Sequence, residues 1–293
     1  MANFGPKDIK KLREMTDAGM MDCKKALEAS DGDMEKAQEW LRKKGLGAAA
    51  KKADKVAAEG VVAVRINGDK AYIIEVNSQT DFVAKNEKFQ EFVNEVLDYI
   101  VENDFNSVEE LNNGTINGEA FADYLALKIA TIGENLVVRR YAKIVSEGGS
   151  LGAYVHANGR VGVIVASNKA GQEDKLKNVA MHAAAMNPRY LNEESVPADV
   201  IEKEKEIARE QLLKEGKPEN ILDKILPGKI KRFMQDNTLE NQKFVMDDKI
   251  AVKDYVASDD KDAKLTDFVR FEVGEGIEKK EEDFAAEVAK QMA

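Results

Sequence analysis

Two stretches of this chain have the hydrophobic pattern of a β-hairpin, and helical patterns follow both. In each stretch, two runs rich in Val, Ile and Ala flank an Asn-Gly pair, which is typical of a two-residue hairpin turn. The hairpins, each given as strand, turn and strand, are 61–66, 67–68 and 71–76, and then 152–157, 158–159 and 161–166. We therefore expect two similar structural units within the chain.

Helices and a closing strand complete each predicted unit. Apolar residues recur at helical spacing after each hairpin. The predicted helices are 87–103 and 119–131 in the first unit and 173–186 in the second, and the closing strands are 136–145 and 268–273. The expected fold class is α+β, with two repeated subdomains that each contain a three-stranded antiparallel sheet.

A helical hairpin interrupts the second unit. Residues 197–235 are charged and helical in pattern, and 215–218 supply the turn between two apolar stripes. Each of these helices buries too little apolar surface to be stable alone, so the two must pack on each other or on a partner. Pro227, followed by Gly228, is expected to break or kink the second helix.

The N-terminal residues predict three short helices. Asp22 and Asp33 are placed to cap the second and third of them, and Gly45 and Gly47 are expected to end the third. Three helices of this length resemble ubiquitin-associated domains. Met20 and Met21 lie in a turn, where they either close the small core or form an adaptable binding surface. The sequence leaves both readings open.

These elements divide the chain into five predicted parts. The last part is expected to be one amphipathic helix, with Phe284, Val288 and Met292 on one stripe. The parts are a ubiquitin-associated-like bundle with a linker rich in Ala and Lys (1–55), a first core subdomain (56–148), a second core subdomain (149–190 and 236–276), the inserted hairpin (191–235) and the C-terminal helix (277–293).

Composition narrows the classes of function. The net charge of -10 disfavours a protein that follows nucleic-acid phosphates with a basic face, and no apolar run approaches the ~20 residues of a membrane span in this sequence. The N-terminus lacks a secretory signal pattern, so we expect a cytoplasmic location. One cysteine and two histidines exclude a disulfide framework and a thiolate or imidazole metal cluster. No phosphate-binding loop or nucleophile elbow is found.

The segment 80–86 is the strongest candidate for a functional site. It links an apolar strand to an amphipathic helix and places the carboxylate of Asp81 beside the ring of Phe82. An exposed Phe stabilises a complex by roughly 1.5–3 kcal/mol when a partner's pocket buries it. The residues alone are equally compatible with a projecting Phe82 and with a Phe82 packed under its own helix.

Three other residues are weaker candidates. The four residue types Thr-Asp-Phe-Val recur at 266–269, but there they run into an alternating strand pattern, so Phe268 is expected to pack on the sheet. His156 lies beside a hairpin turn and is more often a surface or packing residue than a site. His182 is expected to be structural. Neither histidine has a neighbouring pattern that suggests general-base work.

Four segments carry motifs that are specific when they occur together. They are residues 11–27, 79–86, 132–135 and 268–276. In this order, and over essentially the whole chain, they resemble bacterial translation elongation factor Ts. The resemblance implies a guanine nucleotide exchange factor for the GTPase elongation factor Tu, with no covalent chemistry and no cofactor of its own. Pro227 departs from the family's usual pattern, which has an acidic residue before the glycine.

The resemblance also implies roles for particular residues. Those that would dislocate Mg²⁺ in the partner GTPase are Thr80, Asp81, Phe82 and Val83. Other contacts with the partner would come from Arg13, Met20, Met21, Ile132, Gly133, His156 and Phe284. The inserted hairpin resembles the family's coiled-coil or dimerisation insertion, which leaves a homodimer or a 2:2 complex open. No direct binding of nucleotide, nucleic acid or membrane is expected.

Two other classes of function are weighed against this one. An enzyme or nucleotide-binding protein would need a phosphate loop, and binding of GDP by the isolated chain would reveal it. An RNA-binding translation protein would stack bases on aromatic side chains of a sheet. The acidic charge and the aromatic content of 6% count against that class.

Overall fold

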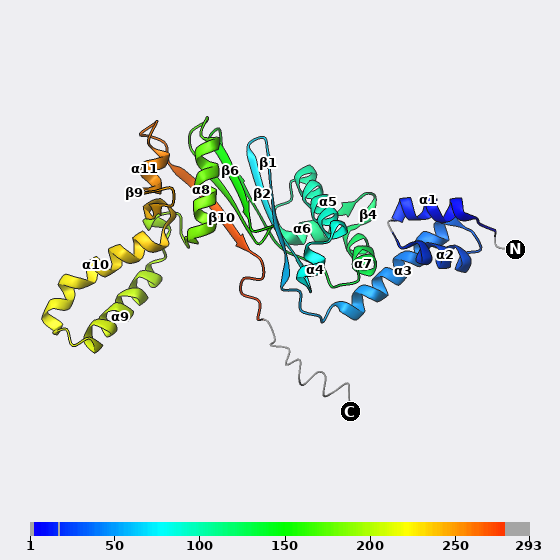
Figure 1. The fold of residues 1–293 in the computed structure, drawn as a ribbon, viewed down its shortest axis with the longest axis horizontal. Coiled ribbons are helices and arrows are strands. Elements are labelled where there is room, and N and C mark those ends of the chain that lie inside the picture. Colours follow the sequence, from blue (N-terminus) through cyan, green and yellow to red (C-terminus); the bar gives the residue numbers. More distant parts are fainter. Residues whose placement is uncertain (1–2, 17, 279–293) are drawn as a thin grey trace, which may run out of the picture. The chain divides into compact units, whose positions relative to one another are not determined.

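A computed structural model describes residues 3–16 and 18–278, and Figure 1 shows the order of the elements. The chain divides into two compact units. Unit 1 holds the chain up to Val61, Glu75–Arg140 and the chain from Val273 onward, whereas unit 2 holds Val62–Ile74 and Tyr141–Glu272. The described residues combine helices with small sheets, which confirms the predicted α+β class.

Three helices form the N-terminal part of unit 1, as predicted. They are α1 (Pro6–Thr16), α2 (Met20–Ala29) and α3 (Met34–Lys52). Their apolar faces share one small core, which consists of Leu12, Ala18, Cys23, Ala26, Leu27, Ala37 and Leu41. Burial raises the pKa of the Cys23 thiol. Because a thiol in these surroundings is neutral, Cys23 acts as a small apolar residue of this core.

The two predicted helix caps have different outcomes. Asp33 caps α3, because its carboxylate accepts a hydrogen bond from the N–H of Lys36 at 3.1 Å. Asp22 does not cap α2, since that helix already begins at Met20 and Asp22 lies in its first turn. A negative charge in the first turn still favours the helix by interacting with its dipole.

The third helix does not end at Gly45 or Gly47, so that prediction is wrong. Gly45 is buried inside α3, and a Cβ at this position would lie 3.3 Å from the Cα of Leu127 in α7 (Phe121–Ile132). The glycine therefore allows α3 and α7 to approach closely. The Ala and Lys residues that follow are good helix formers, so the helix continues through the predicted linker.

The helices after the first hairpin are partly as predicted. The expected helix 87–103 is confirmed as α5 (Glu87–Asn103), whose buried face carries Tyr99, and this ring stacks on Phe121 with centroids 5.7 Å apart. The chain between α5 and α7 forms short elements that the hydrophobic pattern did not predict. They are α6 (Val108–Asn112), β3 (Thr115–Ile116) and β4 (Glu119–Ala120).

The first predicted hairpin and its closing strand form a three-stranded sheet in the order β1–β2–β5. The strands are β1 (Glu59–Asn67), β2 (Lys70–Ser78) and β5 (Val137–Val145). All of the predicted strand residues except Leu136 lie in these strands. The turn is displaced by one residue from the predicted Asn-Gly pair, because Asn67 still belongs to β1 and the chain turns at Gly68 and Asp69.

Glu75 is a fully buried carboxylate in β2. Arg139 Nη1 donates to its Oε1 at 3.1 Å, and Arg140 Nε donates to its Oε2. The backbone N–H of Gly274 and the side-chain amide of Asn77 also donate to Oε1, at 2.8 and 3.0 Å. Burial acts to raise the pKa of Glu75, but these hydrogen bonds and the charge of Arg140 lower it overall. The ionised carboxylate thus ties β2 to β5 and to the chain at Gly274.

The second sheet lies in unit 2 and has the order β10–β7–β6, with both pairs antiparallel. Its strands are β6 (Ser150–His156), β7 (Val161–Ser167) and β10 (Leu265–Glu272). The hairpin is found, but its turn is longer than predicted: β6 ends at His156, so Ala157 belongs to a four-residue turn over 157–160 instead of a two-residue turn at 158–159. The closing strand begins at Leu265 rather than Phe268, because its pairing with β7 already starts opposite Ser167.

His182 lies in α8, which spans Glu173–Met186 as predicted. It is fully buried, its Nε2 lies 2.9 Å from Gln242 Oε1, and the N–H of Val245 donates to its Nδ1 at 3.0 Å. Nδ1 therefore accepts, and Nε2 carries the proton that it donates to Gln242. Burial lowers the pKa of His182. The expected structural role is confirmed.

At Gly152 the backbone of β6 lies very close to α8. A Cβ there would overlap the backbone carbonyl group of Leu176. We predict that Gly152→Ala lowers the free energy of unfolding by roughly 1–3 kcal/mol, the usual cost of overpacking, in a chemical denaturation experiment. The control is Gly228→Ala, because a Cβ at Gly228 in a helix meets nothing within 4 Å. Equal stability of the two variants would contradict this account of the packing.

The inserted hairpin consists of α9 (Ala198–Lys214) and α10 (Glu219–Asn237), which pack on each other (Figure 1). Pro227 was predicted to break or kink the second helix, and the break does not occur, because α10 continues through this position. Pro227 has no N–H to donate to the carbonyl of Asp223. Since Pro227 is exposed, water can reach this part of the helix and satisfy that carbonyl.

The two ends of the insertion meet in unit 2. The N–H groups of Arg189 and Tyr190 both donate to the carbonyl of Asn237, at 2.9 and 3.1 Å, and the N–H of Leu239 donates to Tyr190 at 2.8 Å. The short elements around the insertion were not predicted. They are the 3₁₀ turns η1 (Glu193–Ser195) and η2 (Leu239–Asn241), the strands β8 (Lys243–Phe244) and β9 (Asp247–Ala251), and α11 (Val252–Val256).

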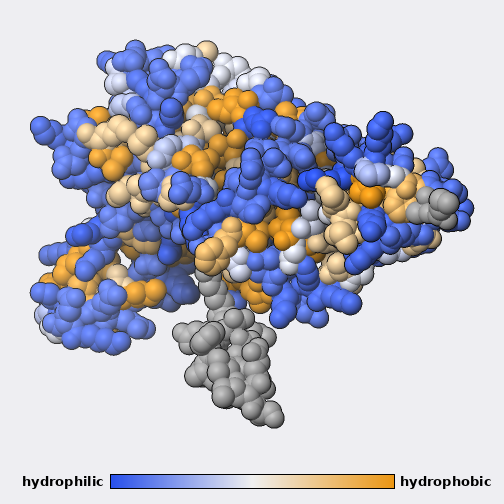
Figure 2. Space-filling model, turned by 45° about the vertical axis from the view of Figure 1, so that its right-hand side comes forward, coloured by the Kyte–Doolittle hydropathy of each residue, from blue (hydrophilic) through white to orange (hydrophobic). Residues whose placement is uncertain are grey.

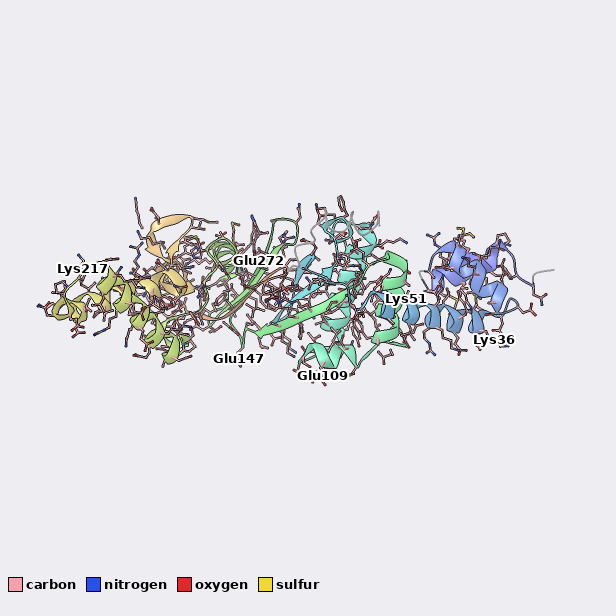
Figure 3. All side chains as sticks on the ribbon, turned by 90° about the horizontal axis from the view of Figure 1, so that it is seen from below. Lys36, Lys51, Glu109, Glu147, Lys217 and Glu272 are labelled. Carbon is pink, nitrogen blue, oxygen red and sulfur yellow. The ribbon has the colours of Figure 1, made fainter. Side chains whose placement is uncertain are left out.

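Charged residues are spread along the described chain. Lys36 and Lys51, near the two ends of α3, are among those labelled in Figure 3. On the face drawn in Figure 2, hydrophobic residues form separate patches among hydrophilic ones. No helix within the described residues is both long and apolar enough to cross a bilayer.

Candidate functional site

The segment after β2 presents an exposed aromatic ring. Thr80 precedes a four-residue helix, α4 (Asp81–Ala84), and its Oγ1 accepts a hydrogen bond from the N–H of Val83 at 3.3 Å. Phe82 is 81% exposed, more than any other large hydrophobic side chain in the part of the chain that the structure describes. The reading in which Phe82 packs under its own helix is therefore wrong.

Asp81 stands beside this ring as a charged group. Lys85 Nζ lies 2.7 Å from Asp81 Oδ2, one helical turn further along the chain. The hydrogen bond from Lys85 lowers the pKa of Asp81, so the carboxylate is ionised at neutral pH. Both side chains are exposed, and pairs of this kind exchange readily with water or with a partner's groups.

A second loop supports this segment from the end of α7. The helix ends at the half-buried Ile132, and Gly133 follows with a φ of +95°, a left-handed conformation that glycine adopts without strain. Glu134 comes next. Its Oε2 accepts from the N–H groups of Gln79 and Thr80, each at 3.0 Å, and its Oε1 accepts from Thr80 Oγ1 at 2.7 Å.

Hydrogen bonds are also donated by the loop after α7. The N–H of Asn135 donates to Gln79 Oε1 at 3.0 Å, and Asn135 Nδ2 donates to the carbonyl of Lys55 at 2.8 Å. The sequence had placed Ile132 and Gly133 among the contact residues but had given no role to Glu134, Gln79 or Asn135. Such bonds leave no periodic signal, since their partners lie about fifty to eighty residues apart.

Met20 and Met21 were expected in a turn, but they are the first two residues of α2. Met20 is 58% exposed and Met21 is 63% exposed, and Arg13 on α1 is also exposed. The core of the bundle is complete without either methionine. Their alternative role in closing this core is therefore wrong, and the surface reading agrees with the structure.

The remaining candidates have different positions. His156 is exposed at the end of β6, and its Nδ1 lies 3.0 Å from the hydroxyl of Tyr154. The second Thr-Asp-Phe-Val copy lies within β10, and Phe268 is partly buried against the core of unit 2, as predicted. The predicted C-terminal helix with Phe284 lies outside the described residues, so its role stays a prediction.

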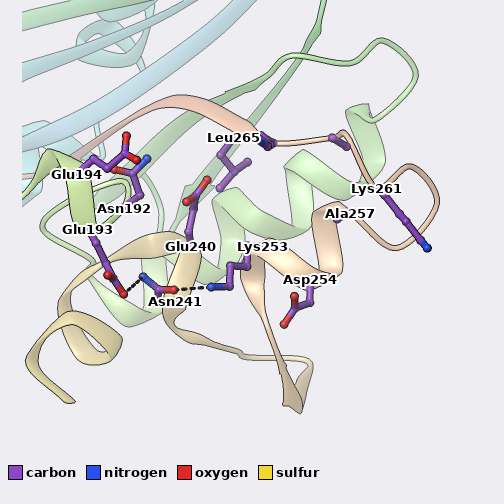
Figure 4. A pocket seen from close by; sticks show the side chains of 12 residues that line it. Asn192, Glu193, Glu194, Glu240, Asn241, Lys253, Asp254, Ala257, Lys261 and Leu265 are labelled. Carbon is purple, nitrogen blue, oxygen red and sulfur yellow. Dashed lines mark hydrogen bonds between the residues drawn. The ribbon is translucent and has the colours of Figure 1, made fainter. Parts of the chain in front are cut away.

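Unit 2 also contains a polar hollow of about 570 Å³ (Figure 4). Lys253 Nζ donates to Asn241 Oδ1 at 2.9 Å, and Asn241 Nδ2 donates to Glu193 Oε1 at 3.4 Å. Burial raises the pKa of Glu240, which also lines the hollow. These wall groups bond to one another, and no group of three or more metal-binding side chains is found among the described residues. The geometry does not identify a catalytic site here.

The chain presents an ionised carboxylate and an exposed aromatic ring on a short helix that a second loop holds in place. This arrangement is typical of a protein that binds another protein. The family model described as "Elongation factor TS" matches residues 79–275. Proteins named elongation factor Ts are similar to the chain over nearly its whole length. The one from Nitratiruptor sp. is 57% identical and covers 97% of both chains. Those from Sulfurovum sp. and Campylobacter hominis are 50% and 46% identical and cover 100% and 98% of both chains. The chain therefore belongs to the elongation factor Ts family, which confirms the resemblance found in the sequence.

Proposed function

We propose that this chain binds elongation factor Tu in its GDP-bound state and promotes the release of GDP during translation elongation. Membership of the elongation factor Ts family supports the general function, nucleotide exchange by a translation factor. The observation that supports the finer mechanism is the exposed ring of Phe82 beside the ionised Asp81. An exposed Phe contributes nothing to the folded monomer, but it contributes to a complex that buries it.

The proposed mechanism acts on the magnesium site of the partner. Mg²⁺ requires nearly octahedral oxygen ligands and joins groups of a GTPase to the phosphates of its nucleotide. Insertion of Phe82 would shift an element of the GTPase and displace these ligands. Asp81 would compete for hydrogen bonds near the metal, with Thr80 and Val83 holding the pair in place. The nucleotide would then be bound more weakly, without any covalent step.

Binding of the chain and binding of the nucleotide to the GTPase are thermodynamically linked. If the chain weakens GDP binding by some factor, GDP weakens binding of the chain by the same factor. The chain should therefore bind the nucleotide-free GTPase most tightly, and either GDP or GTP should release it. Calorimetric titration of the chain into nucleotide-free and GDP-loaded elongation factor Tu tests this, and equal affinities for the two forms would contradict it.

The N-terminal bundle is proposed to anchor the complex through Met20, Met21 and Arg13. Met20→Gln together with Met21→Gln should weaken binding to nucleotide-free elongation factor Tu by roughly tenfold, because two half-exposed apolar side chains are lost from the interface. The melting temperature should not change, since neither side chain belongs to the core. Titration of the partner measures the affinity.

The matched control for this pair is Met186→Gln, at a methionine that is 46% exposed at the end of α8. Deletion of the whole bundle is a less specific test, because Leu127 of α7 packs against the bundle core and would be uncovered. An unchanged affinity of the double variant would refute the anchoring role. His156, Ile132, Gly133 and Phe284 are proposed as further contacts with the partner.

A further inference from the structure

We propose that Glu134 is a positioning residue, which fixes the direction in which Asp81 and Phe82 leave the surface. The inference rests on the proposed function. Glu134 is not itself expected to enter the partner. It acts through Thr80, which begins the short helix that carries the exposed pair.

The exposed ring has no packing of its own to orient it. Phe82 is 81% exposed, so its direction is set by the backbone of α4 rather than by neighbouring side chains. A helix of four residues is far too short to be stable alone. Its direction must therefore come from the groups that hold its first turn.

Those groups are Thr80 and, behind it, Glu134. Thr80 Oγ1 has one proton and two lone pairs. The proton is donated to Glu134 Oε1 at 2.7 Å, and a lone pair accepts the N–H of Val83 at 3.3 Å. Glu134 thus selects the rotamer of Thr80 that caps α4, and that cap fixes the backbone on which Phe82 stands.

Glu134 also holds the backbone that enters the helix. Its Oε2 accepts both the N–H of Gln79 and the N–H of Thr80, each at 3.0 Å. The bond from Asn135 N–H to Gln79 Oε1 closes the link from the other side at 3.0 Å. Both loops belong to unit 1, and Gly133 turns the chain so that Glu134 can reach across.

The test compares Glu134→Ala and Glu134→Gln with Glu91→Ala, which removes an exposed carboxylate from α5. In Glu134→Gln the amide oxygen can still accept the two backbone N–H groups, and the amide N–H₂ can donate to Thr80 Oγ1, which keeps a lone pair for Val83. We therefore expect release of fluorescent GDP at saturating chain to fall about tenfold in Glu134→Ala, the scale of a small misplacement of a reacting group. It should fall much less in Glu134→Gln and not at all in Glu91→Ala.

Three readouts separate positioning from general stability. The melting temperature of Glu134→Ala should stay close to that of the parent chain. Amide hydrogen exchange over residues 79–86 should become faster in the free Glu134→Ala chain, whereas it should not change in Glu91→Ala. Adding Glu134→Ala to Phe82→Ala should cause no further loss of exchange activity, because both substitutions remove the same interaction.

Several results would overturn the inference. One is an unchanged rate of GDP release at saturation in Glu134→Ala. Another is a loss of exchange activity that is fully explained by unfolding of the variant. A third is a loss of exchange activity in Glu134→Ala that adds to the loss in Phe82→Ala. Failure of the proposed function looks different, since the parent chain would then not accelerate GDP release at all. In that case hydrogen exchange over 79–86 would still report whether Glu134 holds the loop.

Discussion

Phe82→Ala should slow the release of GDP from elongation factor Tu by roughly ten- to a hundredfold, while the chain keeps its stability. Burial of this side chain in a partner is worth about 1.5–3 kcal/mol, and each 1.4 kcal/mol corresponds to about a factor of ten. The ring is 81% exposed in the free chain, so its removal leaves no cavity. Stopped-flow measurement of fluorescent GDP release, together with thermal melting, gives both quantities.

The second Thr-Asp-Phe-Val copy provides a matched control within the same chain. Phe268 is partly buried against the core of unit 2. Phe268→Ala should therefore cost about 2 kcal/mol of stability, roughly half the cost for a fully buried ring, and should leave the exchange rate of the folded protein unchanged. If Phe268→Ala abolished exchange without lowering the melting temperature, the wrong copy would have been assigned to the partner.

Glu75→Ala should destabilise the chain by about 3–5 kcal/mol, the cost of removing one partner of a buried ion pair. The substitution leaves the guanidinium groups of Arg139 and Arg140 without their shared carboxylate, and the N–H of Gly274 loses its acceptor. Chemical denaturation measures the change. The control Glu102→Ala, at an exposed position of α5, should stay within about 0.5 kcal/mol of the parent chain.

The contribution of Glu75 should also depend on pH in one direction. The pKa of Glu75 in the folded chain lies below its ordinary value of 4.5. A lowered pKa means that the stabilisation is complete above the pKa of the unfolded chain and is lost as the pH falls through the folded value. The stability difference between the parent chain and Glu75→Gln should be constant near neutral pH and should shrink below about pH 4.5. A difference that grows on acidification would contradict this assignment.

Long amphipathic elements could be predicted closely from the sequence. The bounds of α5 and α8 agree with the hydrophobic pattern, because each helix buries one continuous stripe. The two Asn-Gly pairs likewise located the hairpins in the chain, although the turns themselves lie at 68–69 and 157–160. Short elements such as β3, β4 and α11 could not be predicted, since they are too short for a periodic pattern and are held by tertiary contacts.

Glycine and proline residues lie inside two helices that the sequence pattern had expected them to interrupt. Gly45 was expected to end a helix, but it lies inside α3, where the absence of a side chain allows α7 to pack closely. Pro227 was expected to break or kink the second hairpin helix, but α10 continues through it at an exposed position where water can replace the lost hydrogen bond. In both cases the tertiary environment, which a local pattern does not contain, outweighed the local propensity.

The candidate site was only half predictable. Asp81 and Phe82 stood out because a loop rarely places a ring and a carboxylate side by side, yet their exposure could be established only from the fold. Glu134 lies in the motif segment 132–135, but the sequence did not indicate its bonding role, because its partners lie 54 and 55 positions earlier in the chain. The exposed pair was identified from residue chemistry, whereas its support became visible only in three dimensions.

The exchange activity is tested by the release of fluorescent GDP from elongation factor Tu, followed over a concentration series of the chain. The release rate should rise with the concentration of the chain and then saturate at a value well above the spontaneous rate. Phe82→Ala should saturate at a much lower rate. A release rate that stays at the spontaneous value at every concentration of the parent chain would contradict the proposed function.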